Sequence, residues 1–192
     1  MKRMLIAFLL MCLFSACESS KSKTFKTRAE LIKYINNPEN GLKKTDSSGT
    51  VKATFTYRPA ELILPKQMTY TKDQLELVRK YQNSLAFVIG FTANGKEVLN
   101  HLQSGQYSGI VQTFGFRMER YIKAIPDGAA AVSAEQCLFL QTFGMGAANQ
   151  LLVVFDKRKL IHSKKIDFVV GEFGLRTGDL HFSFRTEDLM NI

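Results

Sequence analysis

Apolar and polar residues alternate in several stretches of the chain, and this period of two predicts β-strands. In TVKATFTYR (50–58), Val51, Ala53, Phe55 and Tyr57 alternate with polar residues, as in a strand that buries one face. SLAFVIGF (84–91) has no polar residue after Ser84, which predicts a buried strand. The second half predicts further strands near SGIVQTFGFRMERYI (108–122), CLFLQTFG (137–144), NQLLVVFD (149–156), KIDFVVGEF (165–173) and DLHFSFR (179–185). Because short turns separate these strands, antiparallel pairing is expected.

Two segments in the first half have the period of helices instead. TRAE (27–30) has the form of a capping box, in which Thr accepts from the amide three residues on and Glu reaches back. A second such box, TKDQ (71–74), precedes apolar residues at helical spacing up to Leu85. Residues 94–107 fit either a helix or a loop. The pattern therefore predicts an α+β fold with two N-terminal helices and a mainly antiparallel β-sheet or β-sandwich.

The start of the chain has the order of a secretory signal. Lys2 and Arg3 precede the ten apolar residues LIAFLLMCLF (5–14), and small residues follow. This run is too short to span a membrane, since a spanning helix needs about 20 residues. A buried N-terminal helix is the alternative interpretation.

The end of this segment, LFSAC (13–17), resembles a bacterial lipobox, with Phe14 where the motif usually has an aliphatic residue. The resemblance implies that Cys17 is lipidated and becomes the first residue of the mature protein. It divides the chain into a signal peptide (1–16), a lipid-anchored tether (17–24) and a single globular domain (25–192). A signal peptide without lipid on Cys17 is the alternative.

The tether also carries information about location. ESSKSK (18–23) contains no apolar residue, as expected of a solvated segment. Because Glu18 rather than Asp follows the cysteine, the resemblance implies the outer membrane. The basic rather than acidic character of ESSKSK favours its periplasmic face.

Charge and cysteine content restrict the partners further. Removal of residues 1–16 takes away Lys2 and Arg3 and no acidic residue, so the formal charge of +9 becomes +7. A basic exported protein suggests acidic partners such as lipid phosphates, an envelope polymer or an acidic protein, and no nucleic acid is expected.

With Cys12 removed and Cys17 lipidated, Cys137 has no partner for an intramolecular disulfide. Its apolar surroundings predict a buried, inert thiol.

One basic segment is a candidate site for such a partner. DKRKLIHSKK (156–165) joins two predicted strands and carries five basic residues, Lys157, Arg158, Lys159, Lys164 and Lys165. The simpler interpretation is a solvated hairpin connection whose charges keep the sheet soluble. The functional interpretation is a docking loop for anionic headgroups or for an acidic protein.

A second candidate comes from two similar segments, TFTYRPAEL (54–62) and HFSFRTEDL (181–189). Each has an alternating aromatic strand, then Arg58 or Arg185, and then an acid. In the simpler interpretation each strand leads into a helical turn, where the acid favours the exposed amides. In the functional interpretation the two arginines form a surface for an acidic ligand.

Catalytic motifs are not found in the sequence: it has no GxSxG, HExxH, CxxC or phosphate loop. GMGAAN (144–149) lacks the last glycine of a dinucleotide fingerprint and precedes a predicted strand, so it is expected to be a turn.

The three histidines, His101, His162 and His181, share no metal-ligand spacing. His181 lies near three acids in the sequence, and their convergence would give an acid/base or metal site. The acids are Asp167, Glu172 and Asp179. Solvated or structural histidines are the simpler interpretation.

Together these features predict a non-catalytic cell-envelope lipoprotein that binds or assembles with an acidic or envelope partner, without a cofactor or a metal. One alternative is a periplasmic hydrolase with a dispersed acid/histidine site. Another is an envelope-lodged inhibitor or immunity protein.

Overall fold

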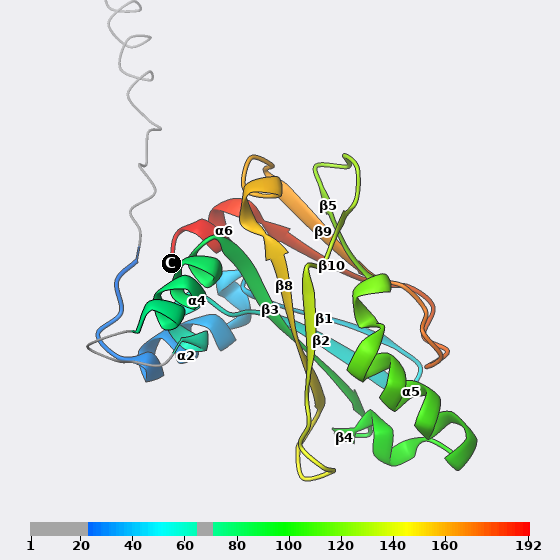
Figure 1. Ribbon diagram of the computed structural model, residues 1–192. Helices are drawn as coiled ribbons and strands as arrows, with labels where there is room; N and C mark the ends of the chain where they lie inside the picture. Colours follow the sequence, from blue (N-terminus) through cyan, green and yellow to red (C-terminus); the bar gives the residue numbers. More distant parts are fainter. Residues whose placement is uncertain (1–22, 65–70) are drawn as a thin grey trace, which may run out of the picture.

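In the computed structural model, residues 23–64 and 71–192 are described, and Cys17 lies outside them. The described chain combines helices with two antiparallel sheets, which confirms the α+β class (Figure 1). The strands are β1 (Lys43–Ser48), β2 (Val51–Tyr57), β3 (Ser84–Ala93), β4 (Lys96–Glu97), β5 (Ile122–Pro126), β6 (Val132–Ser133), β7 (Gln136–Leu140), β8 (Asn149–Asp156), β9 (Lys165–Val170) and β10 (Leu180–Arg185). The α-helices are α2 (Arg28–Asn36), α3 (Ala60–Ile63), α4 (Lys72–Gln82), α5 (Ser104–Phe116) and α6 (Thr186–Met190). The 3-10 turns are η2 (Pro38–Asn40), η3 (Val98–His101), η4 (Met118–Arg120) and η5 (Lys157–Lys159).

The larger sheet has six strands in the order β1-β2-β3-β8-β7, with β4 paired to the end of β3. The smaller sheet has the order β10-β9-β5-β6. The two sheets meet where β1 and β10 lie side by side. At this contact, the Asp46 carboxylate in β1 accepts a 2.8 Å hydrogen bond from the His181 amide in β10. Strand alternation therefore buries the inner face of each sheet against the other.

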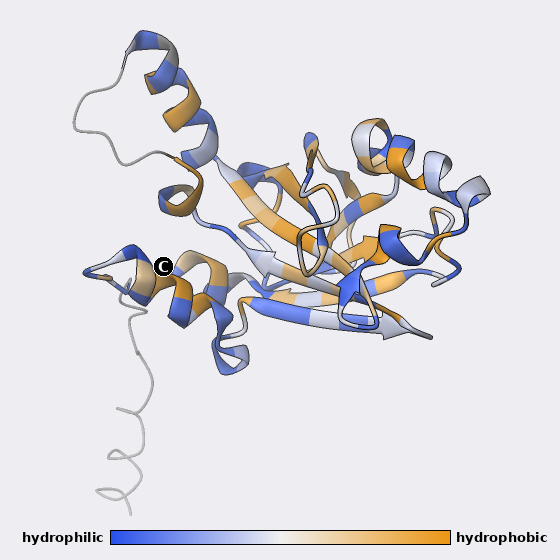
Figure 2. Cartoon of the chain, turned by 90° about the horizontal axis from the view of Figure 1, so that it is seen from below, coloured by the Kyte–Doolittle hydropathy of each residue, from blue (hydrophilic) through white to orange (hydrophobic). Residues whose placement is uncertain are grey.

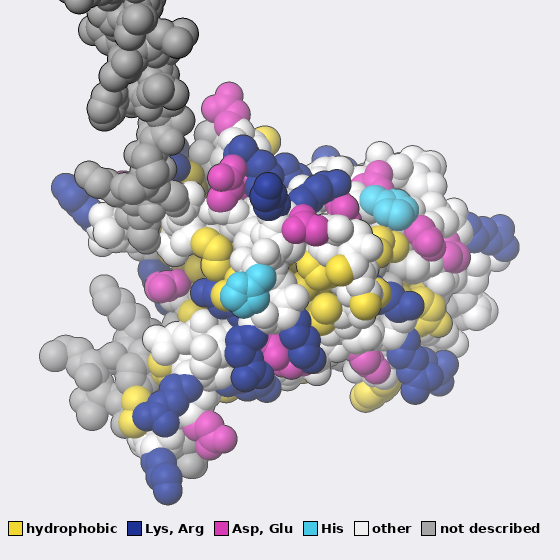
Figure 3. Space-filling model, turned by 90° about the horizontal axis from the view of Figure 1, so that it is seen from above, with side chains coloured by type: hydrophobic (Ala, Val, Ile, Leu, Met, Phe, Trp, Pro, Cys, Tyr) yellow, Lys and Arg dark blue, Asp and Glu magenta, His cyan; other side chains and the backbone are white. Residues whose placement is uncertain are grey.

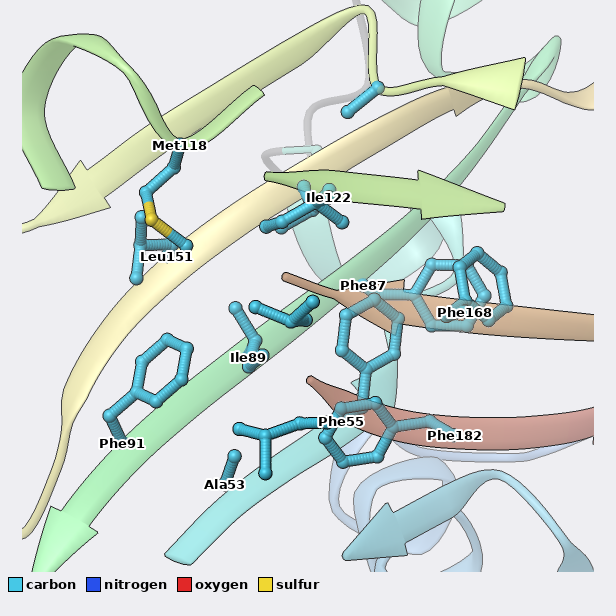
Figure 4. Close-up of a cluster of buried hydrophobic side chains, with 14 of the residues drawn as sticks. Ala53, Phe55, Phe87, Ile89, Phe91, Met118, Ile122, Leu151, Phe168 and Phe182 are labelled. Atoms are coloured by element: carbon cyan, nitrogen blue, oxygen red, sulfur yellow. The ribbon is translucent and has the colours of Figure 1, made fainter. Parts of the chain in front are cut away.

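The core between the sheets is strongly aromatic. Phe55 and Phe87 from the larger sheet meet Phe168 from the smaller one, with ring centroids 5.0 Å and 4.6 Å from it (Figure 4). Tyr57 and Phe184, which the sequence pattern predicts to face the core, are 6% and 1% exposed. The inward positions of the strands thus form one continuous hydrophobic cluster.

The helices gather at two ends of the sheets (Figures 1 and 2). The pairing of Ser84 with Asp156 and of Phe91 with Asn149 defines these ends. At the first, which we call the terminal end, lie η5, α6 and both ends of the described chain, since the Lys23 amide donates to the Asn191 carbonyl at 2.8 Å. At the other, the far end, lie β4, η3, α5 and the loop between β7 and β8 (residues 141–148).

One sequence prediction is wrong. Residues 108–122, assigned above to a strand, form most of α5, then η4 and the start of β5. Ile110, Thr113 and Phe114 are spaced as on one helical face, and all three are buried. This burial outweighs the low helix propensity of the glycines in the segment.

Candidate functional site

Two long segments at the far end of the molecule carry no charged side chain. The sequence has no Asp, Glu, Lys or Arg from Val98 to Phe116 or from Gln136 to Phe155, although 22% of the chain is charged. The structure packs these two segments against each other, with the rings of Phe114 in α5 and Phe139 in β7 5.2 Å apart. We call the surface formed by the loop between β7 and β8 and by the side of α5 that carries Tyr107 and Val111 the uncharged face. Sequence analysis missed it, although the two charge-free stretches are visible in the sequence.

Large apolar side chains are exposed on this face. Phe143 and Met145, in the loop between β7 and β8, are 82% and 87% exposed. Tyr107 in α5 is 48% exposed. Single exposed apolar residues are common, but a group of them on a charge-free surface marks an interaction site.

A crevice of about 180 Å³ opens between α5 and the same loop. Tyr107 and Val111 of α5 form one wall, Phe139 of β7 contributes to the apolar lining, and Phe143 lies on the loop side. Asn100 and Gln141 add polar groups to the lining. The combination of apolar walls and a few polar groups suits the docking of a partner's side chain.

A buried carboxylate holds the loop in place. Glu97 in β4 is 2% exposed, and its Oε1 accepts hydrogen bonds from the Gly146 amide at 2.7 Å and from the Thr142 hydroxyl. Its Oε2 accepts a hydrogen bond from the side-chain amide nitrogen of Asn149 at 3.0 Å. The side-chain oxygen Oδ1 of Asn149 in turn accepts from the Leu99 backbone amide at 2.9 Å. Glu97 forms no ion pair with any residue in the described ranges. Because a buried polar group without partners is costly, two hydrogen bonds to the loop and a third to the first residue of β8 indicate that the shape of this loop matters.

The backbone of the loop is also constrained. Phe143 has φ of +52°, in the left-handed region that non-glycine residues rarely adopt. Such a conformation costs on the order of 1 kcal/mol and is retained where surrounding contacts enforce it. Gly144, at φ +78°, follows it, and β8 begins at Asn149, so the GMGAAN segment is a turn before a strand, as predicted.

Two of the five basic residues in the segment 156–165 form local ion pairs. Arg158 holds Asp156 with two hydrogen bonds, Nη2 to Oδ2 at 2.9 Å and Nε to Oδ1 at 3.0 Å. The side-chain hydrogen bond from Arg158 lowers the pKa of Asp156, outweighing the effect of burial. Lys165 pairs with Asp167 at 3.0 Å. Three lysines form no ion pair with any described residue: Lys157, Lys159 and Lys164.

Of the predicted basic residues, the structure brings Lys164, Lys165 and Arg185 together around one hollow beside α6. Arg185 lies opposite Lys165 in the β9–β10 ladder and makes two hydrogen bonds to Asp188, with an ion pair to Glu187 at 3.0 Å. Arg58 does not line this hollow.

The two similar segments are both junctions between a strand and a helix. β2 leads into α3 with Glu61 in its first turn, and β10 leads into α6 with Asp188 in its first turn. Arg58, half-buried after β2, donates its amide to the Ala86 carbonyl at 2.8 Å, and burial lowers the pKa of its guanidinium. These junctions have the geometry of the simpler interpretation.

Two of the acids near His181 in the sequence, Glu172 and Asp179, form hydrogen bonds within their own loop. The Glu172 carboxylate accepts hydrogen bonds from the amides of Gly174, Arg176 and Gly178 at 2.6, 3.0 and 2.8 Å. Although burial raises the pKa of Glu172, these amides lower it by more. The Asp179 carboxylate accepts from the Glu172 amide at 3.1 Å, so both acids organise their own loop.

Asp167 lies instead on the outer face of the smaller sheet. It accepts from the Ser183 hydroxyl and pairs with Lys165, and although burial raises the pKa of Asp167, these two partners lower it by more. His101, His162 and His181 are all exposed. Within residues 23–64 and 71–192, no three His, Cys, Asp or Glu side chains are grouped as a metal would require.

Cys137 is half-buried in β7 and packs against the main core as a free thiol. Burial, with a smaller contribution from the charge of Glu119, raises the pKa of the thiol to about 12. The thiolate is therefore scarce at neutral pH.

Comparison with known proteins adds no family to this picture, since no family model, no curated protein and no solved structure matches the chain. None of the helices in the described part of the chain has the length and apolar character needed to cross a bilayer.

Proposed function

We propose that this protein is a lipid-anchored, non-catalytic binding module of the cell envelope, and that its uncharged face engages a partner protein. The observation that carries this proposal is the exposure of Phe143 and Met145, at 82% and 87%, on a loop that a buried carboxylate holds in shape. Depletion of charge and enrichment in aromatic residues and Met characterise the cores of protein–protein interfaces. A protein surface of matching apolar character, with a side chain that enters the crevice, is the expected partner.

The lipobox-like LFSAC supports anchoring through a lipid on Cys17, with the periplasmic face of the outer membrane as the proposed location. Six residues further on, Lys23 enters the domain at the terminal end. The uncharged face lies at the far end and would point away from the membrane. A partner in the periplasm, rather than the anchoring membrane itself, is therefore proposed for this face.

A site-specific photocrosslink tests the partner. A photoreactive amino acid in place of Phe143 in the full chain should join one protein in cells, and Met145→Asp should abolish that product. Phe116 is the matched control, because it is 79% exposed but lies half a helical turn from Tyr107 around α5. If Phe143 gives no more specific a product than Phe116, or labels lipid alone, the proposed interface is wrong.

Cell fractionation tests the anchor separately. Cys17→Ser removes the acceptor of the lipid and should release the protein from the membrane pellet. A variant that pellets as firmly as the wild type would exclude lipid on Cys17 as the anchor.

A further inference from the structure

The lysines at the terminal end lie close to the point where the tether enters the domain. The Lys164 carbonyl accepts a 3.0 Å hydrogen bond from the amide of Thr186, the first residue of α6. Just past the other end of this helix, the Asn191 carbonyl accepts from the Lys23 amide at 2.8 Å. Because five helical residues rise about 7 Å, the Lys164 end of the basic loop 157–165 lies within roughly 15 Å of Lys23.

The charges of this end are not all neutralised. The described acids near the loop are Asp127, Glu135, Asp156, Asp167, Glu187 and Asp188, of which Glu135 acts on Arg158 through its charge without forming an ion pair. Asp156 and Asp167 pair with Arg158 and Lys165, the two α6 acids pair with Arg185, and Asp127 accepts the amides of Lys164 and Lys165 at 2.8 and 2.9 Å.

Three lysines on the same loop are left without an ion pair in the described chain: Lys157, Lys159 and Lys164. Exposed Lys26 lies next to the chain entry. Figure 3 views the side on which η5 lies and shows Lys and Arg side chains gathered there in groups, with acids among them.

We propose that this basic loop docks on the anionic lipid headgroups of the membrane that holds Cys17. The inference rests on the proposed lipid anchor. Six residues of chain span at most about 20 Å, so the terminal end cannot move far from the bilayer. Lysines this close to an anionic leaflet come within the Debye length of about 10 Å at 0.1 M salt. The lipid holds the protein on the membrane, and the lysines fix which end of the domain faces it.

The expected size of the effect follows from the number of lysines. Each Lys near an anionic leaflet favours the docked orientation by about fivefold, so the three unpaired lysines together favour it by about 100-fold. The attraction falls with salt, because the Debye length shrinks to about 3 Å at 1 M. Zwitterionic lipid should give no such preference.

The experiment uses the lipidated full chain in vesicles that contain a headgroup quencher. A dye is attached to His162→Cys in the basic loop or, as the matched position at the far end, to Ser108→Cys. The Cys137 thiol, with its pKa of about 12, remains protonated and reacts slowly at pH 7. In vesicles with phosphatidylglycerol at low salt, the dye in the loop should be quenched strongly and the dye on α5 weakly. In pure phosphatidylcholine the difference should disappear.

Charge reversal provides the decisive comparison. Lys157→Glu, Lys159→Glu and Lys164→Glu together should abolish the preferential quenching of the loop, as should 0.5 M salt on the unaltered chain. The matched control reverses Lys52, Lys96 and Arg117, three exposed basic residues elsewhere, and should leave the quenching unchanged. Equal quenching in anionic and zwitterionic vesicles, or equal loss in the control variant, would overturn the proposal. Flotation with zwitterionic vesicles reports the lipid anchor alone, so failure of the anchor is recognised separately.

Discussion

The two ends of this molecule use charge in opposite ways. At the terminal end, carboxylates such as Asp156 stabilise exposed basic residues through short local pairs, and three lysines on the same loop remain unpaired. At the far end, two long segments have no charged side chain, and the buried carboxylate of Glu97 holds a loop. Asp156 is itself buried, but all three of its hydrogen bonds come from Arg158, two residues along the chain, whose side chain is 82% exposed, so this pair contributes little to stability. The hydrogen bonds of Glu97 instead join segments about 50 residues apart, and they therefore determine the shape of the loop. Surface chemistry, rather than the sheets that join the ends, distinguishes their proposed roles.

Removing the carboxylate at each end should give the largest contrast. Glu97→Ala leaves the Gly146 amide and the Asn149 side chain without their acceptor, so unfolding should become easier by about 2–4 kcal/mol. Asp156→Ala removes an ion pair whose arginine is 82% exposed together with the cap of η5, and should cost about 1 kcal/mol. Urea unfolding monitored by circular dichroism measures both. Similar losses for the two variants would remove the contrast between the ends.

A smaller effect is expected from glycine substitutions at the far end. A Cβ at Gly146 would lie 2.6 Å from the Glu97 Oε1, so Gly146→Ala should destabilise by about 1–3 kcal/mol and weaken the Phe143 crosslink. Gly109, in α5, has no atom within 4 Å of the corresponding position, and Gly109→Ala should stabilise the helix by about 0.5–1 kcal/mol. Melting temperatures should move in opposite directions. A Gly146→Ala protein as stable as the wild type would show that the loop has room to adjust.

The smallest effect concerns acid pH at the terminal end. Because Arg158 holds the pKa of Asp156 below its ordinary value of 3.8, this group stabilises the folded state above that pH. The contribution is lost as the pH falls through the lowered pKa. The stability difference between wild type and Asp156→Asn should therefore be constant near pH 7 and shrink below about pH 4. Unfolding curves measured from pH 7 to pH 2.5 provide the check, and a difference that grows in acid would refute the assignment.

The strands of this fold are well encoded in local patterns. Alternation in TFTY and HFSF predicted the buried side of β2 and β10, and the predicted apolar strands correspond to β3 and β8. Helix α5 is different, because its residue before the first turn, Gln103, makes no side-chain cap, and Gly105, Gly109 and Gly115 weaken helix propensity. The packing of Phe114 against Phe91 and Phe139 selects the helix, and local sequence does not contain that information.

The candidate sites also differ in how far apart their residues lie in the sequence. The basic loop was visible in the sequence because its residues are consecutive. The hydrogen bonds of Glu97 were not visible in the sequence, since 49 positions separate this residue from Gly146, whose amide donates to it. The charge-free stretches gave a signal, but only the structure shows that they form one surface.

The hydrogen bond between Lys23 and Asn191 makes the fold a candidate for circular permutation. Chain ends that lie this close tolerate a short covalent link. The exposed β3–β4 turn at Asn94 and Gly95, where both residues have positive φ, offers an opening at the opposite end of the sheets. A permutant joined at 192–23 and opened there would keep every strand pairing but carry the proposed lipid anchor at the far end. The same domain would then stand inverted on the bilayer, with its uncharged face toward the lipid and its lysines toward the periplasm.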